Sequence, residues 1–188
     1  MTRILMATSM LALAASGALA QETSFNRIAS FPTWTNIPED QDRAVTTSSE
    51  IIDATEDGMM LVYSDSPLEV VGMIDISDPA NPQPGGLIEL DGEPTAVSVL
   101  GGTVFVGINT SESFTAPSGH LAHYVLETGE LAADCDLGGQ PDSTAVAPDG
   151  SFVTVAIENE RDEDLGDGRV GQMPGGFVAI IPLDETGM

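Results

Sequence analysis

The sequence predicts an all-β protein of the β-propeller class, and three observations support this prediction. A strand–turn–strand pattern recurs three times at a spacing of about 46 residues, with turns at Asp57-Gly58, Gly101-Gly102 and Asp149-Gly150. A second marker, Gly92-Glu93-Pro94-Thr95, recurs as Gly139-Gln140-Pro141-Asp142. No helical period is visible after residue 20, and Gly and Pro separate runs of β-branched residues. All-strand repeats of this length are typical of propeller blades.

The first twenty residues have the pattern of a secretory signal peptide. Arg3 is followed by an apolar run from Ile4 to Ala15, and Ala18-Leu19-Ala20 is a small-x-small cleavage site. We therefore expect cleavage after Ala20, a periplasmic or secreted protein, and no transmembrane segment in the mature chain. Residues 21–48 are polar and irregular, and Pro32 and Pro38 argue against a helix there. This segment is expected to lie along the outside of a blade or to complete the last one.

The three repeats span residues 49–92, 93–139 and 140–188. Each begins with a β-rich segment, turns at its glycine and continues through further strands, as at Met59–Tyr63 and Thr103–Val106. The third repeat ends before a fourth strand, and closed propellers need about four to eight blades. We therefore expect the chain to be the N-terminal part of a larger propeller of about seven blades.

The charge of the chain limits its partners. Thirty acidic residues oppose five basic ones, all Arg, and the net charge is −25. This charge repels nucleic-acid phosphates and anionic lipid surfaces, which leaves a small ligand, a cation or an extracytoplasmic protein as the expected partner. The carboxylates have two interpretations, cation binding or solubility in a salty exterior where repulsion is screened.

Propeller topology predicts which loops gather around the central opening. The loops joining the second and third strands of each repeat should share one rim with the residues that enter the first strand: Glu50, Thr95 and Asp142. Glu50 and Asp142 each precede their turn glycine by the same interval, so we expect these three residues to occupy matching places on the ligand-binding face. Carboxylates that converge on one rim suit a hard cation.

The third of these loops is the longest and the most acidic. Long loops on a rigid scaffold tend to carry function. The candidate ligands for a metal, with Ca²⁺ as the expected ion, are Glu158, Glu160, Asp162, Asp164 and Asp167. The spacing of the three aspartates departs from an EF-hand loop at the glycine and the terminal glutamate. The alternative is a solvated loop paired internally through Arg161 and Arg169.

Other chemistry has little support in the sequence. No Gly-x-Ser-x-Gly nucleophile motif, phosphate-binding glycine loop or zinc spacing is present. His120 and His123 lie three apart in an expected strand and should point to opposite faces. Cys135 is the only cysteine, so it forms no intrachain disulfide.

Several of these segments carry a family resemblance. The run Ser49–Ile52, the turn Ile74–Pro82, the two Gly-x-Pro markers and the turn Ala147–Gly150 resemble exported bacterial YVTN-type propellers. More narrowly, they resemble the choice-of-anchor I and "esterase-like activity of phytase" groups, often labelled alkaline-phosphatase-like. The similarity covers roughly residues 48–183. It implies a propeller fold and calcium-assisted phosphoester hydrolysis, but it assigns no catalytic residue to this sequence.

Two functions follow as hypotheses. The first is an exported acidic propeller that acts as a ligand- or cation-binding scaffold module. The second is a calcium-dependent phosphoesterase, in which a bound cation polarises a phosphoryl oxygen and activates water. Because the chain is so acidic, phosphate would approach only a metal-neutralised site, so the second hypothesis requires the metal.

Overall fold

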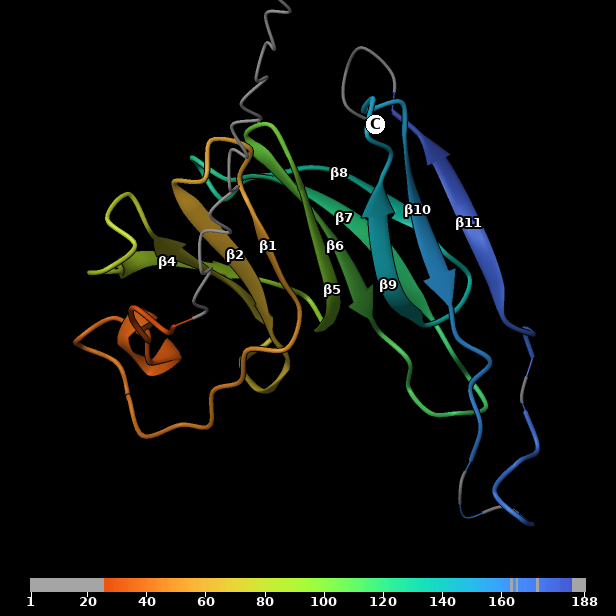
Figure 1. Ribbon diagram of the computed structural model, residues 1–188. Helices are drawn as coiled ribbons and strands as arrows, with labels where there is room; N and C mark the ends of the chain where they lie inside the picture. The colour runs from red at the N-terminus through yellow and green to blue at the C-terminus, as the bar shows by residue number, and fades with distance from the viewer. Residues whose placement is uncertain (1–25, 163, 165, 172, 184–188) are drawn as a thin grey trace, which may run out of the picture.

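The computed structural model describes residues 26–162, 164, 166–171 and 173–183. The expected signal peptide and its cleavage site lie outside these residues. The described chain is all-β apart from two short 3₁₀ helices, η1 (Thr33–Asn36) and η2 (Ser66–Leu68). Its strands form three antiparallel sheets that follow one another in sequence order (Figure 1). The predicted fold class, an all-β propeller architecture, is confirmed. Among the described residues no helix has the length and apolar character needed to cross a membrane.

The first sheet has the order β1-β2-β3-β4, formed by β1 (Ile52–Ala54), β2 (Met60–Asp65), β3 (Val70–Asp75) and β4 (Gln83–Glu89). β1 is shorter than the expected strand from Glu50, because the backbone is irregular there. The amide of Glu50 donates to the carbonyl of Ser64, and the amide of Ile51 donates to the Ser64 hydroxyl. Gly58 closes the turn between β1 and β2 at a φ of 67°, where a side chain would be strained.

The second sheet repeats this order with β5 (Glu93–Leu100), β6 (Thr103–Asn109), β7 (Gly119–Val125) and β8 (Leu131–Asp136). The third contains β9 (Pro141–Val146), β10 (Phe152–Ile157) and β11 (Phe177–Pro182) in the order β11-β10-β9. The register of β9 shifts around Asp142, and that of β5 shifts around Thr95. Glu50, Thr95 and Asp142 therefore occupy corresponding irregular positions in the three sheets.

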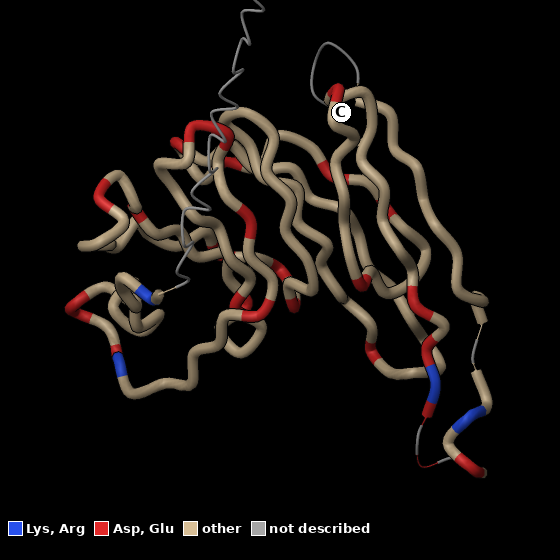
Figure 2. The backbone as a smooth tube through the Cα atoms, viewed as in Figure 1, with Lys and Arg blue, Asp and Glu red and all other residues tan. Residues whose placement is uncertain are grey.

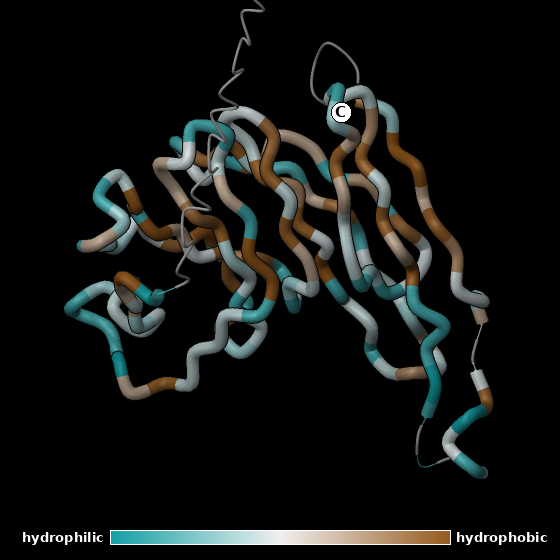
Figure 3. Tube along the Cα trace, in the orientation of Figure 1, coloured by the Kyte–Doolittle hydropathy of each residue, from teal (hydrophilic) through white to brown (hydrophobic). Residues whose placement is uncertain are grey.

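Two apolar interfaces hold the sheets together. The first packs Val62, Val71 and Met73 of the first sheet against Val104 and Val106 of the second. The other packs the second sheet against the third; its buried members are Phe105, Leu121, Leu137, Val153, Val155 and Ile157. Figure 3 shows the hydrophobic residues that recur along these central strands. The alternation of β10, in which Val153, Val155 and Ile157 are buried and their neighbours are more exposed, is that of a strand with one covered face.

Polar contacts between the innermost strands repeat the spacing of the sequence. The Ser98 hydroxyl lies 2.7 Å from the Thr144 hydroxyl, 46 residues away. The Val99 amide donates to Asp53 Oδ2 at 2.8 Å, also across 46 residues. Asp53 and Ser98 occupy equivalent positions, three residues after Glu50 and Thr95. The first and second repeats thus each place a polar side chain where it reaches the first strand of the next sheet.

The segment before the first sheet packs against the side of that sheet that the second sheet does not cover. Asn36 donates through Nδ2 to the Tyr63 hydroxyl and to the carbonyl of Met73, both at 2.9 Å. Ile37 is buried beside it. Further along, the Ser48 amide donates to the buried carboxylate of Asp65 at 3.0 Å. These contacts anchor the segment, which lies beside β4 in Figure 1.

Candidate functional site: an acidic cleft between the second and third sheets

A cleft of about 620 Å³ opens where the β6–β7 and β10–β11 loops approach each other. Both loops leave their sheets on the same side of the molecule, below the strands in Figure 1. The acidic residues that line the cleft are Glu93, Glu158, Glu160, Asp162 and Asp164. The remaining lining residues are the polar Asn109, Ser111, Ser113 and Gln140, the aromatic Phe114 and the basic Arg161. Carboxylates therefore dominate its chemistry, as the red segments on these loops in Figure 2 illustrate.

Two equivalent pairs of residues lie where these loops begin. In the second sheet Asn109 Nδ2 donates to Glu93 Oε2 at 3.2 Å, and in the third Gln140 Nε2 donates to Glu158 Oε2 at 3.4 Å. Counting from the register shifts at Thr95 and Asp142, Glu93 corresponds to Gln140. The acid and the amide have exchanged strands between the two repeats. In each sheet, the hydrogen bond from the amide fixes the orientation of one carboxylate at the point where the loop begins.

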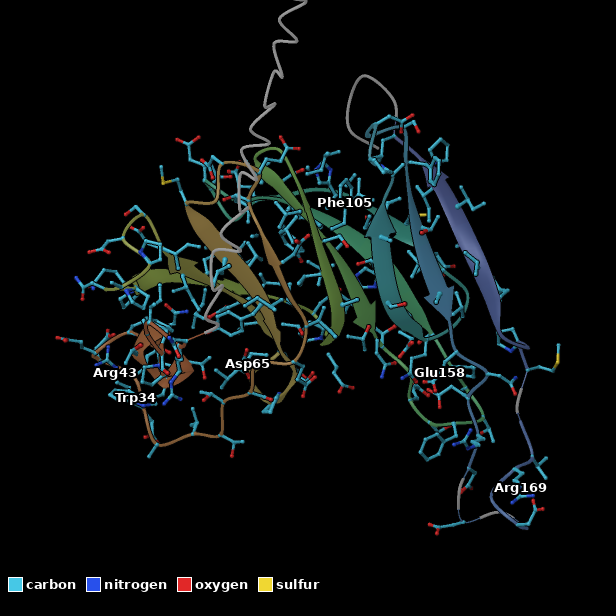
Figure 4. The ribbon with its side chains drawn as sticks, in the orientation of Figure 1. Trp34, Arg43, Asp65, Phe105, Glu158 and Arg169 are labelled. Atoms are coloured by element: carbon cyan, nitrogen blue, oxygen red, sulfur yellow. The ribbon has the colours of Figure 1, made fainter. Side chains whose placement is uncertain are left out.

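Glu160 is the buried member of the five lining carboxylates, with 8% of its surface exposed. Burial and the neighbouring Glu158 carboxylate raise the pKa of Glu160. Both effects act against its negative charge, and a cation placed in the cleft would relieve both. Figure 4 labels Glu158 near the start of this loop and Arg169 far from it, at the outer end.

Two aspartates of the loop accept hydrogen bonds from backbone amides of the same loop. Asp162 Oδ1 accepts the amide of Asp164 at 2.9 Å, and Asp167 Oδ1 accepts the amide of Arg169 at 3.1 Å. Within the described part of the chain, no three His, Cys, Asp or Glu side chains gather closely enough to hold a metal ion. The oxygen donors suit Ca²⁺ by type. The described arrangement does not present them as a ready coordination shell.

The structure separates the residues predicted from the sequence into two groups. Glu158, Glu160, Asp162 and Asp164 line the cleft, whereas Asp167 does not. The ligand-face residues Glu50, Thr95 and Asp142 lie outside its lining. Glu50 accepts a hydrogen bond from the Ser66 hydroxyl at 2.7 Å, and Thr95 donates to the Gly107 carbonyl at 3.2 Å. Asp142 is exposed.

Sequence reasoning placed the β6–β7 and β10–β11 loops on one rim, but it missed Glu93 and Gln140, which lie beside the starts of β5 and β9. In the sequence, Glu93 and Gln140 stand out only as members of a repeated Gly-x-Pro marker. Their shared position two residues before Thr95 and Asp142 was the available signal, because it places both at the rim. Phe114, which is half exposed on the facing loop, gave no signal of its own.

The two histidines have ordinary structural surroundings. His120 Nε2 lies 3.3 Å from Asp91 Oδ1, which belongs to the connection between β4 and β5. His123 is buried and stacks on Phe105 with a ring separation of 4.8 Å. Burial lowers the pKa of His123, and its Nε2 has no hydrogen-bond partner among the described residues. Neither histidine lines the cleft.

The sheets and the rim cleft together define a β-propeller module with an acidic site between two of its blades. The chain matches the choice-of-anchor I domain over residues 50–187 and belongs to that family. A search of curated proteins finds no match.

Solved structures share the fold at low sequence identity. A functionally unknown protein from Desulfotomaculum acetoxidans is 9% identical with a TM-score of 0.55, over 77% of this chain and 39% of the other. Hydrazine synthase from Kuenenia stuttgartiensis is 17% identical with a TM-score of 0.51, over 72% and 39%. A luciferin-regenerating enzyme is 15% identical with a TM-score of 0.51, over 71% and 44%. The chain thus spans less than half of each of these proteins, and the likeness concerns the fold.

Proposed function

We propose that this protein is an exported binding module whose cleft between the second and third sheets takes a cationic ligand. The observation that carries the proposal is the buried Glu160, which lies beside Glu158 in a cleft lined by three further carboxylates. Desolvation and like charge, which raise the pKa of Glu160, make its ionisation more costly than that of an exposed glutamate. A bound cation would offset that cost, so the site gains more from a cation than exposed surface carboxylates do.

The location outside the cytoplasm rests on the sequence and on the family. The first twenty residues have the pattern of a secretory signal peptide, and the choice-of-anchor description is consistent with a protein of the cell exterior. Extracellular calcium-binding modules typically have dissociation constants of about 10⁻⁴–10⁻³ M. Ca²⁺ is therefore the first inorganic ligand to test.

A calcium titration monitored by thermal unfolding tests the proposal. At a calcium concentration about a hundred times the dissociation constant, binding should stabilise the folded chain by about 2.7 kcal/mol. The stabilisation should disappear with chelator and be strongly reduced in Glu160→Gln, which preserves shape but removes the charge. Asp134→Asn is the matched control, because Asp134 is an exposed acid outside the cleft. If neither calcium nor an organic polyamine stabilises the chain, the cationic-ligand proposal is wrong.

The phosphoesterase hypothesis is tested in the same titration with a phosphomonoester substrate. It requires a cation in the cleft to neutralise the carboxylates and to polarise a phosphoryl oxygen. Hydrolysis that needs calcium and is lost in Asp162→Asn combined with Asp164→Asn would favour this activity. Calcium binding without turnover would favour the binding module.

A further inference from the structure

The third sheet has an apolar face that the described residues leave uncovered. We call the face that each sheet turns toward the next sheet its forward face. It is formed by alternate residues of its second and third strands, and strand pairing aligns those residues across the three sheets. Val62 pairs with Met73, Phe105 with His123, and Thr154 with Ile180. In each sheet the first of these residues lies four positions after the turn glycine with positive φ.

Exposure separates the third forward face from the other two. Met73 and His123 are 7% and 6% exposed, whereas the equivalent Ile180 is 66% exposed. Val71 and Leu121 are fully buried, whereas the equivalent Val178 is 63% exposed. The difference arises because the second and third sheets cover the forward faces that precede them. Figure 1 shows β10 and β11 at the open end of the row.

The uncovered face is built like one that a sheet already covers. Its residues match those of the first forward face in size, position by position: Phe152 with Met60, Thr154 with Val62, Ala156 with Ser64, Val178 with Val71 and Ile180 with Met73. Volume-conserving exchanges of this kind preserve packing, although Thr154 adds a hydroxyl. A face made only for solvent would have no reason to retain bulky apolar residues at both central positions of β11.

The surfaces that cover the first two forward faces share one pattern. The second strand of the covering sheet reads Val104-x-Val106-x-Ile108 in one case and Val153-x-Val155-x-Ile157 in the other. All six side chains are buried in the interfaces. The corresponding positions of the first sheet are Leu61, Tyr63 and Asp65, so a second copy of this chain does not offer the same surface with its first sheet.

We propose that the forward face of the third sheet is the docking surface for a further blade of this repeat, whose second strand presents Val-x-Val-x-Ile. The occupant continues an interface that the chain already forms twice. The low coverage of the structural neighbours, 39% of the first two, is consistent with additional sheets in proteins of this fold.

A copy of the second sheet is a suitable test blade, because the second sheet already covers the first forward face, which the third forward face resembles. Pro182 of β11 corresponds to Asp75 of β3, since they pair with Phe152 and Met60. Appending a copy of residues 76–183 directly after residue 182 therefore adds an outer strand to the third sheet and then two Val-x-Val-x-Ile sheets, the first of which is expected to cover the forward face. In a Cys135→Ser background, the rate at which the thiol of Ile180→Cys is labelled reports whether the forward face of the third sheet is covered. Glu112→Cys, on an exposed loop, is the control.

We expect Ile180→Cys to be labelled rapidly in the monomeric 188-residue chain and about tenfold more slowly, or slower still, in the extended chain. Glu112→Cys should be labelled at the same rate in both. Changing Val106 to Asp in the appended copy alone should restore rapid labelling. Unchanged labelling in a folded extended chain would overturn the proposal. So would slow labelling in the 188-residue chain accompanied by dimerisation, which would make a second copy the occupant.

A second measurement tests the proposal even if the extended chain does not fold. In the 188-residue chain, Val178→Thr combined with Ile180→Thr should lower the melting temperature far less than Val71→Thr combined with Met73→Thr. The two double variants make closely matched changes on equivalent positions, one uncovered and one covered. Equal losses would show that the third forward face is already buried and would overturn the proposal.

Discussion

Replacing Phe105 by Ala tests whether the second and third sheets share one tightly packed interface. Phe105 is 1% exposed, lies among Leu121, Val153 and Val155, and stacks on His123. Removing a buried phenylalanine ring costs about 3–5 kcal/mol, because the lost transfer free energy adds to the cost of the cavity. For a protein of this length each kcal/mol lowers the melting temperature by roughly 2–4 °C. We therefore expect Phe105→Ala to melt about 6–20 °C below the parent chain.

The matched control is Phe114→Ala, which removes the same ring from a half-exposed position on the β6–β7 loop. Its cost should stay below about 1 kcal/mol, because little surface is returned to water and no closed cavity forms. Urea unfolding followed by circular dichroism gives both free energies, provided that the denaturant slope is the same in the two variants. Equal losses for Phe105→Ala and Phe114→Ala would refute the packing described for this interface.

Three further predictions concern groups buried in or against the sheets. Because burial lowers the pKa of His123, the unfolded state binds its proton more readily, so stability is lost as the pH falls below the ordinary histidine pKa near 6.5. Urea unfolding at pH 7.5 and pH 5 should therefore show a smaller loss of stability in His123→Phe than in the parent chain, and an identical loss would contradict this. Burial raises the pKa of Asp65, so its contribution has the opposite sign: it is fully present below the ordinary aspartate pKa of 3.8 and lost as the pH rises through the higher folded value, and the parent chain should therefore gain stability relative to Asp65→Asn on acidification. A Cβ atom at Gly72 would overlap the Tyr63 ring, so Gly72→Ala should cost about 1–3 kcal/mol by thermal unfolding, whereas Gly102→Ala, where the space is open, should cost little.

The fold was largely predictable because the repeat carries the same information three times. The turn glycines and the apolar strands that follow them occur three times in register, and the Gly-x-Pro marker occurs twice, so an ambiguous position in one repeat can be assigned from another. The strand boundaries were less predictable. β1 begins at Ile52 rather than Glu50 because the Ser64 hydroxyl bonds the backbone at Ile51, a contact between distant residues.

The candidate cleft was only half predictable. Its acidic loop stands out in the sequence by length and charge, and four of its five candidate ligands line the cleft. Glu93 was missed because it belongs to a different repeat, and its place in the same cleft as Glu160 depends on how two sheets pack. Periodicity predicts equivalent positions within repeats, as it did for Glu50, Thr95 and Asp142. It also places the β6–β7 and β10–β11 loops on one rim, but it does not predict which of their side chains line a common space.

The hydrogen bonds of Asn36 help to make the two end faces of the row of sheets different. They hold the N-terminal segment over the Tyr63 side of the first sheet, the side that would otherwise face the uncovered end of another molecule. Two unlike faces that fit each other head to tail generate open filaments when the rotation does not close. The N-terminal segment of this protein occupies one of the two faces, and that face carries Leu61, Tyr63 and Asp65 in place of the Val-x-Val-x-Ile pattern. Both features oppose head-to-tail assembly of the chain.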